Sequence, residues 1–234
     1  MDDAHSYGSK NRRIIPISFP KIIPASDQTI LVQFGDAISK NLHHQVFSFT
    51  RYLLDHPQDD VRNIHPAYNS VMVSLNSSST LASISEYLLS AIDSIKNKES
   101  IIPRTVEVPV MYGGENGPDL DKVSENTALS SSEVIKRHSE AEYLVYFIGF
   151  SIGFPYLGGM DPSIATPRLE SPRKSVPKGS IGIAGDQTGI YPLSSPGGWN
   201  LIGRTEMDIF NVDYPEQSAL QMGDRVKFIP VEVY

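Results

Sequence analysis

Residues 176–205 read VPKGSIGIAGDQTGIYPLSSPGGWNLIGRT, and this stretch decides the fold of the second half of the chain. Short apolar runs, such as Ser180–Ala184 and Asn200–Thr205, alternate in it with turns rich in glycine and proline. The same composition extends over residues 149–203, which hold more than half of the 17 glycines. Proline removes a backbone donor and glycine has an entropic cost in a helix, so long helices are excluded. Short strands between tight turns predict a β-barrel or sandwich.

The residues on either side of this stretch supply further elements of the same domain. A helix is predicted over Ser132–His138, because Ser130 and Glu133 have the spacing of a capping box in front of it. Tyr143–Ile148 is a strand candidate because it is almost entirely apolar, and Arg225–Ile229 is another near the end of the chain. One helix therefore precedes a series of short strands.

The first half of the chain follows a different pattern. Its predicted elements are a strand at 29–34, a helix from Ile38 to His56, strands at 61–64 and 71–75, a helix marked by Leu81 to Ile95, and a strand at 104–110. This β-α-β-β-α-β order is the ferredoxin-like split pattern, in which two amphipathic helices cover one face of an antiparallel sheet. We therefore predict an α+β protein with a flexible N-terminus at 1–13, a ferredoxin-like domain at 14–103 and a barrel domain at 104–234.

Composition excludes several classes of function. The formal net charge of −7 gives no support for a nucleic-acid partner. The first 13 residues contain no apolar run of about 7–15 residues, so no secretory signal is expected. No window approaches the roughly 18 apolar residues of a membrane span. Cysteine is absent, which fits a reducing compartment. We expect a cytoplasmic protein without a nucleic-acid or membrane partner.

Three familiar catalytic motifs fail on their context. Ser151 lies in a GFSIG sequence that matches the serine-hydrolase elbow, but Pro155 forbids the helix that the elbow requires. All six histidines also precede Ser151. His43 and His44 are adjacent on a helix, point in different directions and do not form a metal motif. No HExxH motif is present either, so no metal is predicted. No GxxxxGK loop is present, so direct ATP binding through a P-loop is not predicted.

The candidate site is the glycine-rich region of the second half. Arginine grips carboxylates and phosphates bidentately, and glycine loops expose backbone amides to an oxyanion. The anion-binding candidates are Arg168, Arg173 and Arg204, the polar lining is Tyr112, Tyr156 and Gln187, the oxyanion donors are the amides of Gly197 and Gly198, and Trp199 forms a wall. His138 and Arg204 are the catalytic candidates, His138 as an acid–base residue.

Each of these assignments has a structural alternative. The glycines and prolines turn the corners of a barrel in the alternative interpretation, and the arginines pair with Glu170 or Asp161. A histidine in the last turn of a helix, such as His138, more often interacts with the helix dipole. Trp199 and Tyr156 are equally good candidates for core or interface anchors. Spacing alone leaves these alternatives open.

A resemblance to a known family goes further than spacing. The motifs that carry it are Leu31–Asp36, Pro66–Ser70, Pro109–Gly114, Gly117–Leu120, Gly149–Phe150, Gly153–Gly159, Ala165–Arg168, Pro172–Arg173, Val176–Ser180, Ile183–Gly185, Gln187–Pro192, Ser195–Trp199, Ile202–Thr205 and Gly223–Val226. They resemble the signature of the family that contains the KipI kinase inhibitor, the B subunit of 5-oxoprolinase and subunit 1 of allophanate hydrolase. The likeness covers nearly all of the chain from Pro24. Ile152 departs from it, because the family usually has proline there.

The resemblance implies a cyclophilin-like barrel after the ferredoxin-like domain. It also implies two protein partners, a homologous C subunit and a third component, the A subunit, with which such complexes hydrolyse 5-oxoproline to glutamate at the expense of ATP. A small carboxylate substrate agrees with the arginine-rich site. Two alternatives remain within the family. One is a regulatory protein that inhibits a sporulation histidine kinase, and the other is a component of allophanate or urea breakdown.

Overall fold

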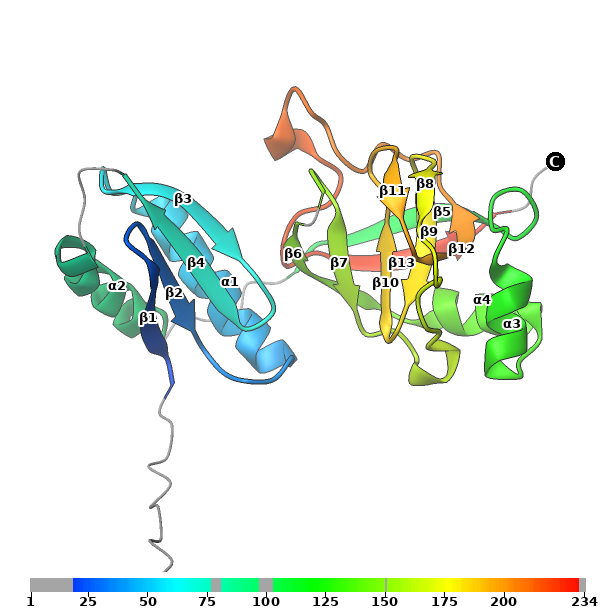
Figure 1. Cartoon of the computed structure of the whole chain (residues 1–234), viewed down its shortest axis with the longest axis horizontal. Coiled ribbons are helices and arrows are strands. Elements are labelled where there is room, and N and C mark those ends of the chain that lie inside the picture. Colours follow the sequence, from blue (N-terminus) through cyan, green and yellow to red (C-terminus); the bar gives the residue numbers. More distant parts are fainter. Residues whose placement is uncertain (1–18, 77–80, 97–102, 150, 232–234) are drawn as a thin grey trace, which may run out of the picture.

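The computed structural model describes residues 19–76, 81–96, 103–149 and 151–231. Within these residues a small domain of helices and one open sheet lies beside a β-barrel domain (Figure 1). The predicted flexible N-terminus, residues 1–13, lies outside the described residues.

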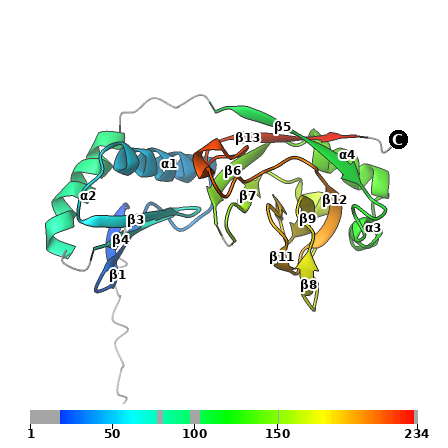
Figure 2. The same cartoon turned by 90° about the horizontal axis from the view of Figure 1, so that it is seen from above.

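The first domain is a sheet with two helices on one face. Its elements are β1 (Lys21–Ser26), β2 (Thr29–Gln33), α1 (Lys40–Asp55), β3 (Val61–Pro66), β4 (Ser70–Leu75) and α2 (Leu81–Ile95). The strands pair antiparallel in the order β1-β2-β4-β3. Both helices lie on the same side of the sheet (Figure 2), and their apolar stripes, including Phe49 and Leu88, bury against Val32 and Val73.

The ferredoxin-like prediction is not confirmed in its last strand. The strand predicted at 104–110 forms as β5 (Thr105–Tyr112), but it belongs to the barrel and not to the first sheet. β1, which the sequence pattern did not predict, occupies an edge of the first sheet as the hairpin partner of β2. The reason is that Val108 and Val110 of β5 are completely buried in the barrel core, where β5 pairs with β13 (Arg225–Pro230) over six residues. Local alternation identifies a strand but not the sheet that it joins.

The second domain is a closed barrel, as predicted, and its cyclophilin-like character stays a prediction. Seven strands close it in the order β10-β7-β6-β13-β5-β12-β9. Besides β5 and β13 they are β6 (Tyr143–Ile148), β7 (Pro155–Gly158), β9 (Ser180–Ala184), β10 (Gln187–Ile190) and β12 (Asn200–Arg204). The strands predicted at 143–148 and 180–184 match β6 and β9. A two-stranded ribbon of β8 (Arg173–Val176) and β11 (Ser195–Gly197) forms a separate small sheet.

The barrel has apolar packing on both sides of its wall. Alternate residues such as Ile181, Ile183 and Phe228 fill the interior. Every residue of β9 is buried, because an outer cluster packs on the other face of this part of the wall. This outer cluster consists of Phe154, Val176, Ala184, Tyr191, Trp199 and Leu201, with Tyr156 packed against it. Two of the predicted site residues, Tyr156 and Trp199, therefore lie on the outer face of this wall.

Two helices cover one end of the barrel. α3 (Leu120–Thr127) packs against β12, and α4 (Ser131–Glu140) packs against β13. The predicted cap of α4 is confirmed, since the Ser130 side chain accepts a hydrogen bond from the amide of Glu133 at 3.2 Å. α3 was not predicted, because its eight residues carry few apolar positions.

Candidate functional site

The outer face of the barrel gathers several of the predicted site residues. Tyr156 lies on β7 and stacks on Phe147 at 4.5 Å between ring centroids, with an interplanar angle of 19°. Phe154 meets Tyr156 at 5.3 Å and Trp199 at 5.4 Å, both edge to face. Gln187 lies on the neighbouring strand β10, and its amide donates to the hydroxyl of Tyr68 from the first domain. Tyr156, Gln187 and Trp199 thus belong to one aromatic surface that also contacts the first domain.

Glycines form the floor of this surface. A Cβ at Gly189 would lie 2.6 Å from Cζ of Phe154, and one at Gly158 would lie 2.1 Å from Cε2 of Tyr146. A Cβ at Gly182 would lie 3.0 Å from Cβ of Trp199. The rings therefore lie directly on the backbone of the strands, which only glycine permits. These glycines serve the packing of the chain's own aromatic rings.

Replacing Gly189 with alanine is expected to displace Phe154 and Trp199. Overpacking of this kind costs about 1–3 kcal/mol, because the added carbon meets two ring edges. Urea unfolding followed by the emission of Trp199, the only tryptophan, measures both the lost stability and the disturbed ring. Gly198→Ala is the matched control, since a Cβ there meets nothing closer than 3.8 Å. Equal stability of the two variants would contradict the close contact at Gly189.

Arg173 is engaged in the structure of the loops. Its Nη2 lies 2.6 Å from Oδ1 of Asp119, and its Nη1 donates to the carbonyl of Trp199 at 3.3 Å. The other carboxylate oxygen of Asp119 accepts from the amide of Leu201 at 2.6 Å. Arg173 therefore has a carboxylate partner, as the structural alternative requires, although the partner is Asp119 and not Glu170 or Asp161.

Arg168 and Arg204 lie at the surface and are not brought together with Arg173. Arg168 borders an open depression of about 510 Å³ that also includes Lys122, Asn126 and Glu170. Its charge favours the ionised forms of Tyr156 and Tyr191, although burial still raises the pKa of both hydroxyls. Arg204 is exposed, and its Nε donates to the carbonyl of Lys178 at 3.1 Å. These two guanidinium groups remain accessible to an anion.

Gly197 and Gly198 differ in their surroundings. Gly197 is buried, and a Cβ there would lie 2.3 Å from the hydroxyl of Tyr191. A Cβ at Gly198 would contact Pro172 at an ordinary 3.8 Å, and the carbonyl of Gly198 accepts from the amide of Leu169 at 2.8 Å. Gly197 thus belongs to the packing beneath the ribbon, whereas Gly198 lies where a ligand can approach.

His138 lies inside the barrel core and not at the outer surface. Its side chain is completely buried and stacks on Phe228 at 4.6 Å. Nδ1 lies 2.7 Å from the hydroxyl of Tyr112, and Nε2 lies 2.9 Å from Oγ1 of Thr188. Burial lowers the pKa of His138 to about 3 and raises that of Tyr112 well above its ordinary value. Both ring nitrogens of His138 are therefore hydrogen-bonded to hydroxyl groups of the chain itself, those of Tyr112 and Thr188.

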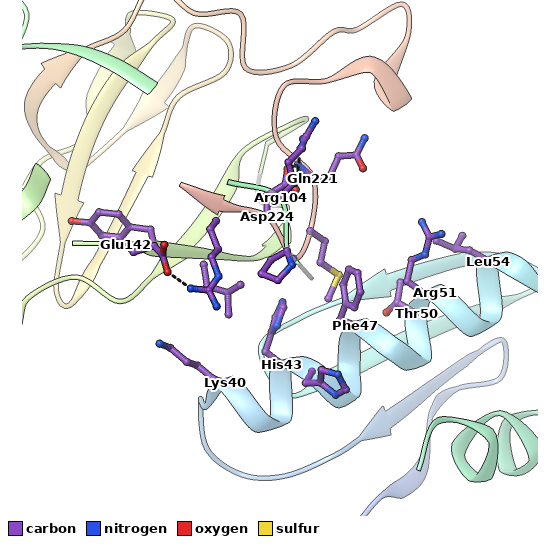
Figure 3. Close-up of a pocket in the computed structure, with 17 residues that line it drawn as sticks. Lys40, His43, Phe47, Thr50, Arg51, Leu54, Arg104, Glu142, Gln221 and Asp224 are labelled. Carbon is purple, nitrogen blue, oxygen red and sulfur yellow. Dashed lines mark hydrogen bonds and ion pairs between the residues drawn. The ribbon is translucent and has the colours of Figure 1, made fainter. Parts of the chain in front are cut away.

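A second hollow, between the two domains, was not predicted from the sequence. A pocket of about 600 Å³ lies between α1 and the barrel, and we call it the junction pocket. His43, Phe47 and Thr50 line it from α1, and the turn at residues 221–225 lines it from the barrel (Figure 3). Gly223, with φ of +90°, admits the ring of Phe47, whose Cε2 lies 2.7 Å from the position of a Cβ there. The sequence signal for this pocket is the presence of two polar residues, His43 and Thr50, on the buried side of α1.

A comparison with protein families decides the affiliation of the chain. Residues 20–220 match the model of the carboxyltransferase domain, subdomain C and D. The chain belongs to this family. The match covers the first domain and the barrel as far as residue 220, and it confirms the resemblance that the sequence motifs carry.

Relatives in the carboxyltransferase subdomain C and D family extend over most of the chain. The B subunit of the 5-oxoprolinase of Bacillus subtilis is 38% identical over 216 residues, which are 88% of this chain and 90% of the relative. The crystal structure of TTHA0988 superposes with a TM-score of 0.77 at 32% identity and covers 88% of this chain, which spans 40% of the TTHA0988 chain. Urea carboxylase of Kluyveromyces lactis, at 19% identity and a TM-score of 0.73, shares the fold over 90% of this chain and 22% of its own.

Two classes of site are not found in the described part of this family member. No group of three histidine, aspartate or glutamate side chains among residues 19–76, 81–96, 103–149 and 151–231 is arranged to hold a metal ion. In the same residues, no helix is both long enough and apolar enough to cross a membrane.

Proposed function

We propose that this chain is the B subunit of an ATP-dependent 5-oxoprolinase and that it acts together with the A and C subunits of the same enzyme. The observation that carries the proposal is the 38% identity to the 5-oxoprolinase B subunit of Bacillus subtilis over 90% of that relative. The reaction opens the lactam of 5-oxoproline with water to give glutamate, and hydrolysis of ATP drives it. The chain works in the cytoplasm, where ATP is available, and is inactive alone.

The accessible arginines are the proposed contacts for the carboxylate of the substrate. Arg168 and Arg204 are exposed, and Arg168 is electrostatically coupled to Tyr156 on the aromatic surface. Gln187, Trp199 and the amide of Gly198 are the proposed polar and aromatic lining of the same site. Guanidinium groups suit this task because they bind carboxylates through two parallel hydrogen bonds.

His138, Arg173, Tyr112 and Gly197 support this site from behind. His138 fixes the hydroxyls of Tyr112 and Thr188, and Arg173 joins the ribbon to Asp119. ATP is bound elsewhere in the complex in this proposal, since the chain has no P-loop sequence.

Co-expression with homologues of the A and C subunits from the same organism tests the proposal. The purified complex is expected to hydrolyse ATP only when 5-oxoproline is present and to release glutamate. Each of the three proteins on its own is expected to be inactive. A stable complex without 5-oxoproline-dependent ATP hydrolysis would overturn the proposal. A substrate panel with urea and allophanate then identifies the other carboxyltransferase-related activity.

Replacing Arg204 with alanine is expected to lower the kcat/KM of the complex for 5-oxoproline by about 10- to 100-fold. A charge-assisted hydrogen bond of about 1.5–3 kcal/mol is lost with the guanidinium group. Assembly, measured by size-exclusion chromatography, is expected to stay unchanged because Arg204 is exposed. Arg62→Ala, at an exposed position on β3 of the first domain, is the control. Unchanged turnover would remove Arg204 from the site.

A further inference from the structure

The junction pocket carries more positive than negative charge, in a chain whose net charge is −7. Its charged lining consists of Lys40, Arg51, Arg104 and Arg225 with Glu142 and Asp224. Both carboxylates are already paired, Asp224 with Arg104 at 2.5 Å and Glu142 with Arg225. The ion pair of Arg51 with Asp55 is long, at 3.6 Å, and both of its side chains are more than half exposed, so it is weak. Lys40 and Arg51 therefore give the pocket its surplus of positive charge.

Two polar atoms of the α1 wall are buried without a partner. Oγ1 of Thr50 has no hydrogen bond within the part of the chain that the structure describes. Nε2 of His43 has none of normal geometry there, although the backbone of Val145 and Tyr146 lies close to the ring. The side chains of His43 and Thr50 are only 5% and 6% exposed. Burial lowers the pKa of His43 to about 4, so its ring is neutral near pH 7. A buried polar atom without a partner costs free energy, which a ligand with a matching group recovers.

A ligand reaches these two atoms after small side-chain movements. Both are shielded from water in the present arrangement, although both residues line the pocket. Threonine in a helix has two accessible χ1 rotamers, and the histidine ring flips about χ2. A rotamer change at Thr50 and a ring flip at His43 are therefore the movements that turn each group toward the pocket.

The wall of α1 is elongated and has the same character at each end. His43 and Thr50 are seven residues apart, which is about 10 Å along a helix axis. Phe47 lies between them on the helix, and Met222 of the barrel also lines the pocket. Lys40 stands at the His43 end and Arg51 at the Thr50 end (Figure 3). Each end thus combines a cation with a buried hydrogen-bonding group, and the middle is apolar.

We propose that the junction pocket binds an elongated organic dianion, with two carboxylates about 10 Å apart and an apolar linker between them. One carboxylate pairs with Lys40 and His43, the other pairs with Arg51 and Thr50, and the linker lies on Phe47. This site is separate from the outer surface of the barrel, and its existence does not depend on the proposed 5-oxoprolinase activity. 5-Oxoproline is too short, with its single carboxylate, to engage both ends.

Isothermal titration of the full chain with octanedioate tests the proposal. Octanoate has one carboxylate, and octane-1,8-diol has the same length without charge. Octanedioate is expected to bind at least about tenfold more tightly than octanoate, because one set of charge-assisted contacts is worth about a factor of ten. The diol and 5-oxoproline are expected to show no saturable binding. Absence of heat with octanedioate, or equal affinity for octanoate, overturns the proposal.

Variants of the α1 wall locate the binding. Lys40→Gln and Arg51→Gln are each expected to weaken octanedioate binding about tenfold, and Arg62→Gln on β3 is expected to leave it unchanged. Thr50→Val removes the unpartnered hydroxyl without changing the shape of the side chain. This variant is expected to raise the melting temperature of the free chain by about 2–4 °C and to weaken binding. A lower melting temperature, or an equal effect of Arg62→Gln, would assign Thr50 a structural role and reject the site.

Discussion

Replacing Asp119 with alanine is expected to remove about 3–5 kcal/mol from the free energy of unfolding. Asp119 is only 7% exposed, and its two oxygens bind Arg173 and the amide of Leu201, each at 2.6 Å. The variant leaves a half-buried guanidinium without its counter-ion and a buried amide without an acceptor. Because net stabilities of whole domains are about 5–15 kcal/mol, this is a large fraction of the total.

Urea unfolding at pH 7.5 measures this loss, and two further variants isolate its cause. Asp119→Asn keeps an acceptor for Leu201 but loses the charge, so an intermediate loss is expected. Asp121→Ala, two residues further along, removes an exposed carboxylate that accepts a hydrogen bond from the hydroxyl of Ser131, and about 0.5 kcal/mol or less is expected. If Asp119→Ala behaved like Asp121→Ala, Asp119 would not hold β12 and the ribbon together.

Acidification from pH 7 to pH 5 is expected to destabilise the chain by about 4 kcal/mol through two histidines. Burial lowers the pKa of His138 to about 3 and that of His43 to about 4, from 6.5. Between the lowered pKa of each histidine and 6.5, the unfolded chain binds protons that the folded chain does not. Stability is therefore full above pH 6.5 and falls as the pH drops. At pH 5, about 1.5 units below 6.5, each histidine lowers the free energy of unfolding by about 2 kcal/mol, because one pH unit corresponds to about 1.4 kcal/mol.

The measurement is a series of urea titrations from pH 7.5 to pH 4.5. The slope of stability against pH approaches two protons near pH 5. In His43→Gln it is expected to fall to about one proton, because only His138 then remains to be protonated on unfolding. A stability that stays constant from pH 7 to pH 5 would show that the two rings are not held neutral by burial.

Several strands of the barrel were predictable because glycine and proline separate short apolar runs, although β7 and β10 were not predicted. Ser180–Ala184 and Tyr143–Ile148 were placed at the residues where β9 and β6 lie. The partner of a strand was not predictable in the same way, since 104–110 alternates equally well for either sheet. Its place between β12 and β13 depends on pairing with residues more than 90 positions later in the chain.

The candidate site was predicted less well than the fold, because side-chain partners are distant in sequence. Arg173 and Asp119 are 54 residues apart, and nothing near Arg173 identifies that carboxylate. The sequence suggested that His138 interacts with a helix dipole or a substrate. In the structure its hydrogen-bond partners are Tyr112 of β5 and Thr188 of β10. The junction pocket depends on how two domains meet, and His43 and Thr50 on the buried side of α1 indicate only one of its walls.

The position of β13 in the barrel has a consequence for synthesis on the ribosome. β13 lies between β5 and β6, and its residues 225–230 are made after every other strand of the barrel. Until they emerge, β5 and β6 each have one edge without its final neighbour, whereas every strand and helix of the first domain precedes residue 96. The first domain can therefore fold early in translation, and the barrel must wait until residues 225–230 have left the ribosome. Nascent chains stalled before residue 225 are a natural substrate for chaperones that shield exposed strand edges.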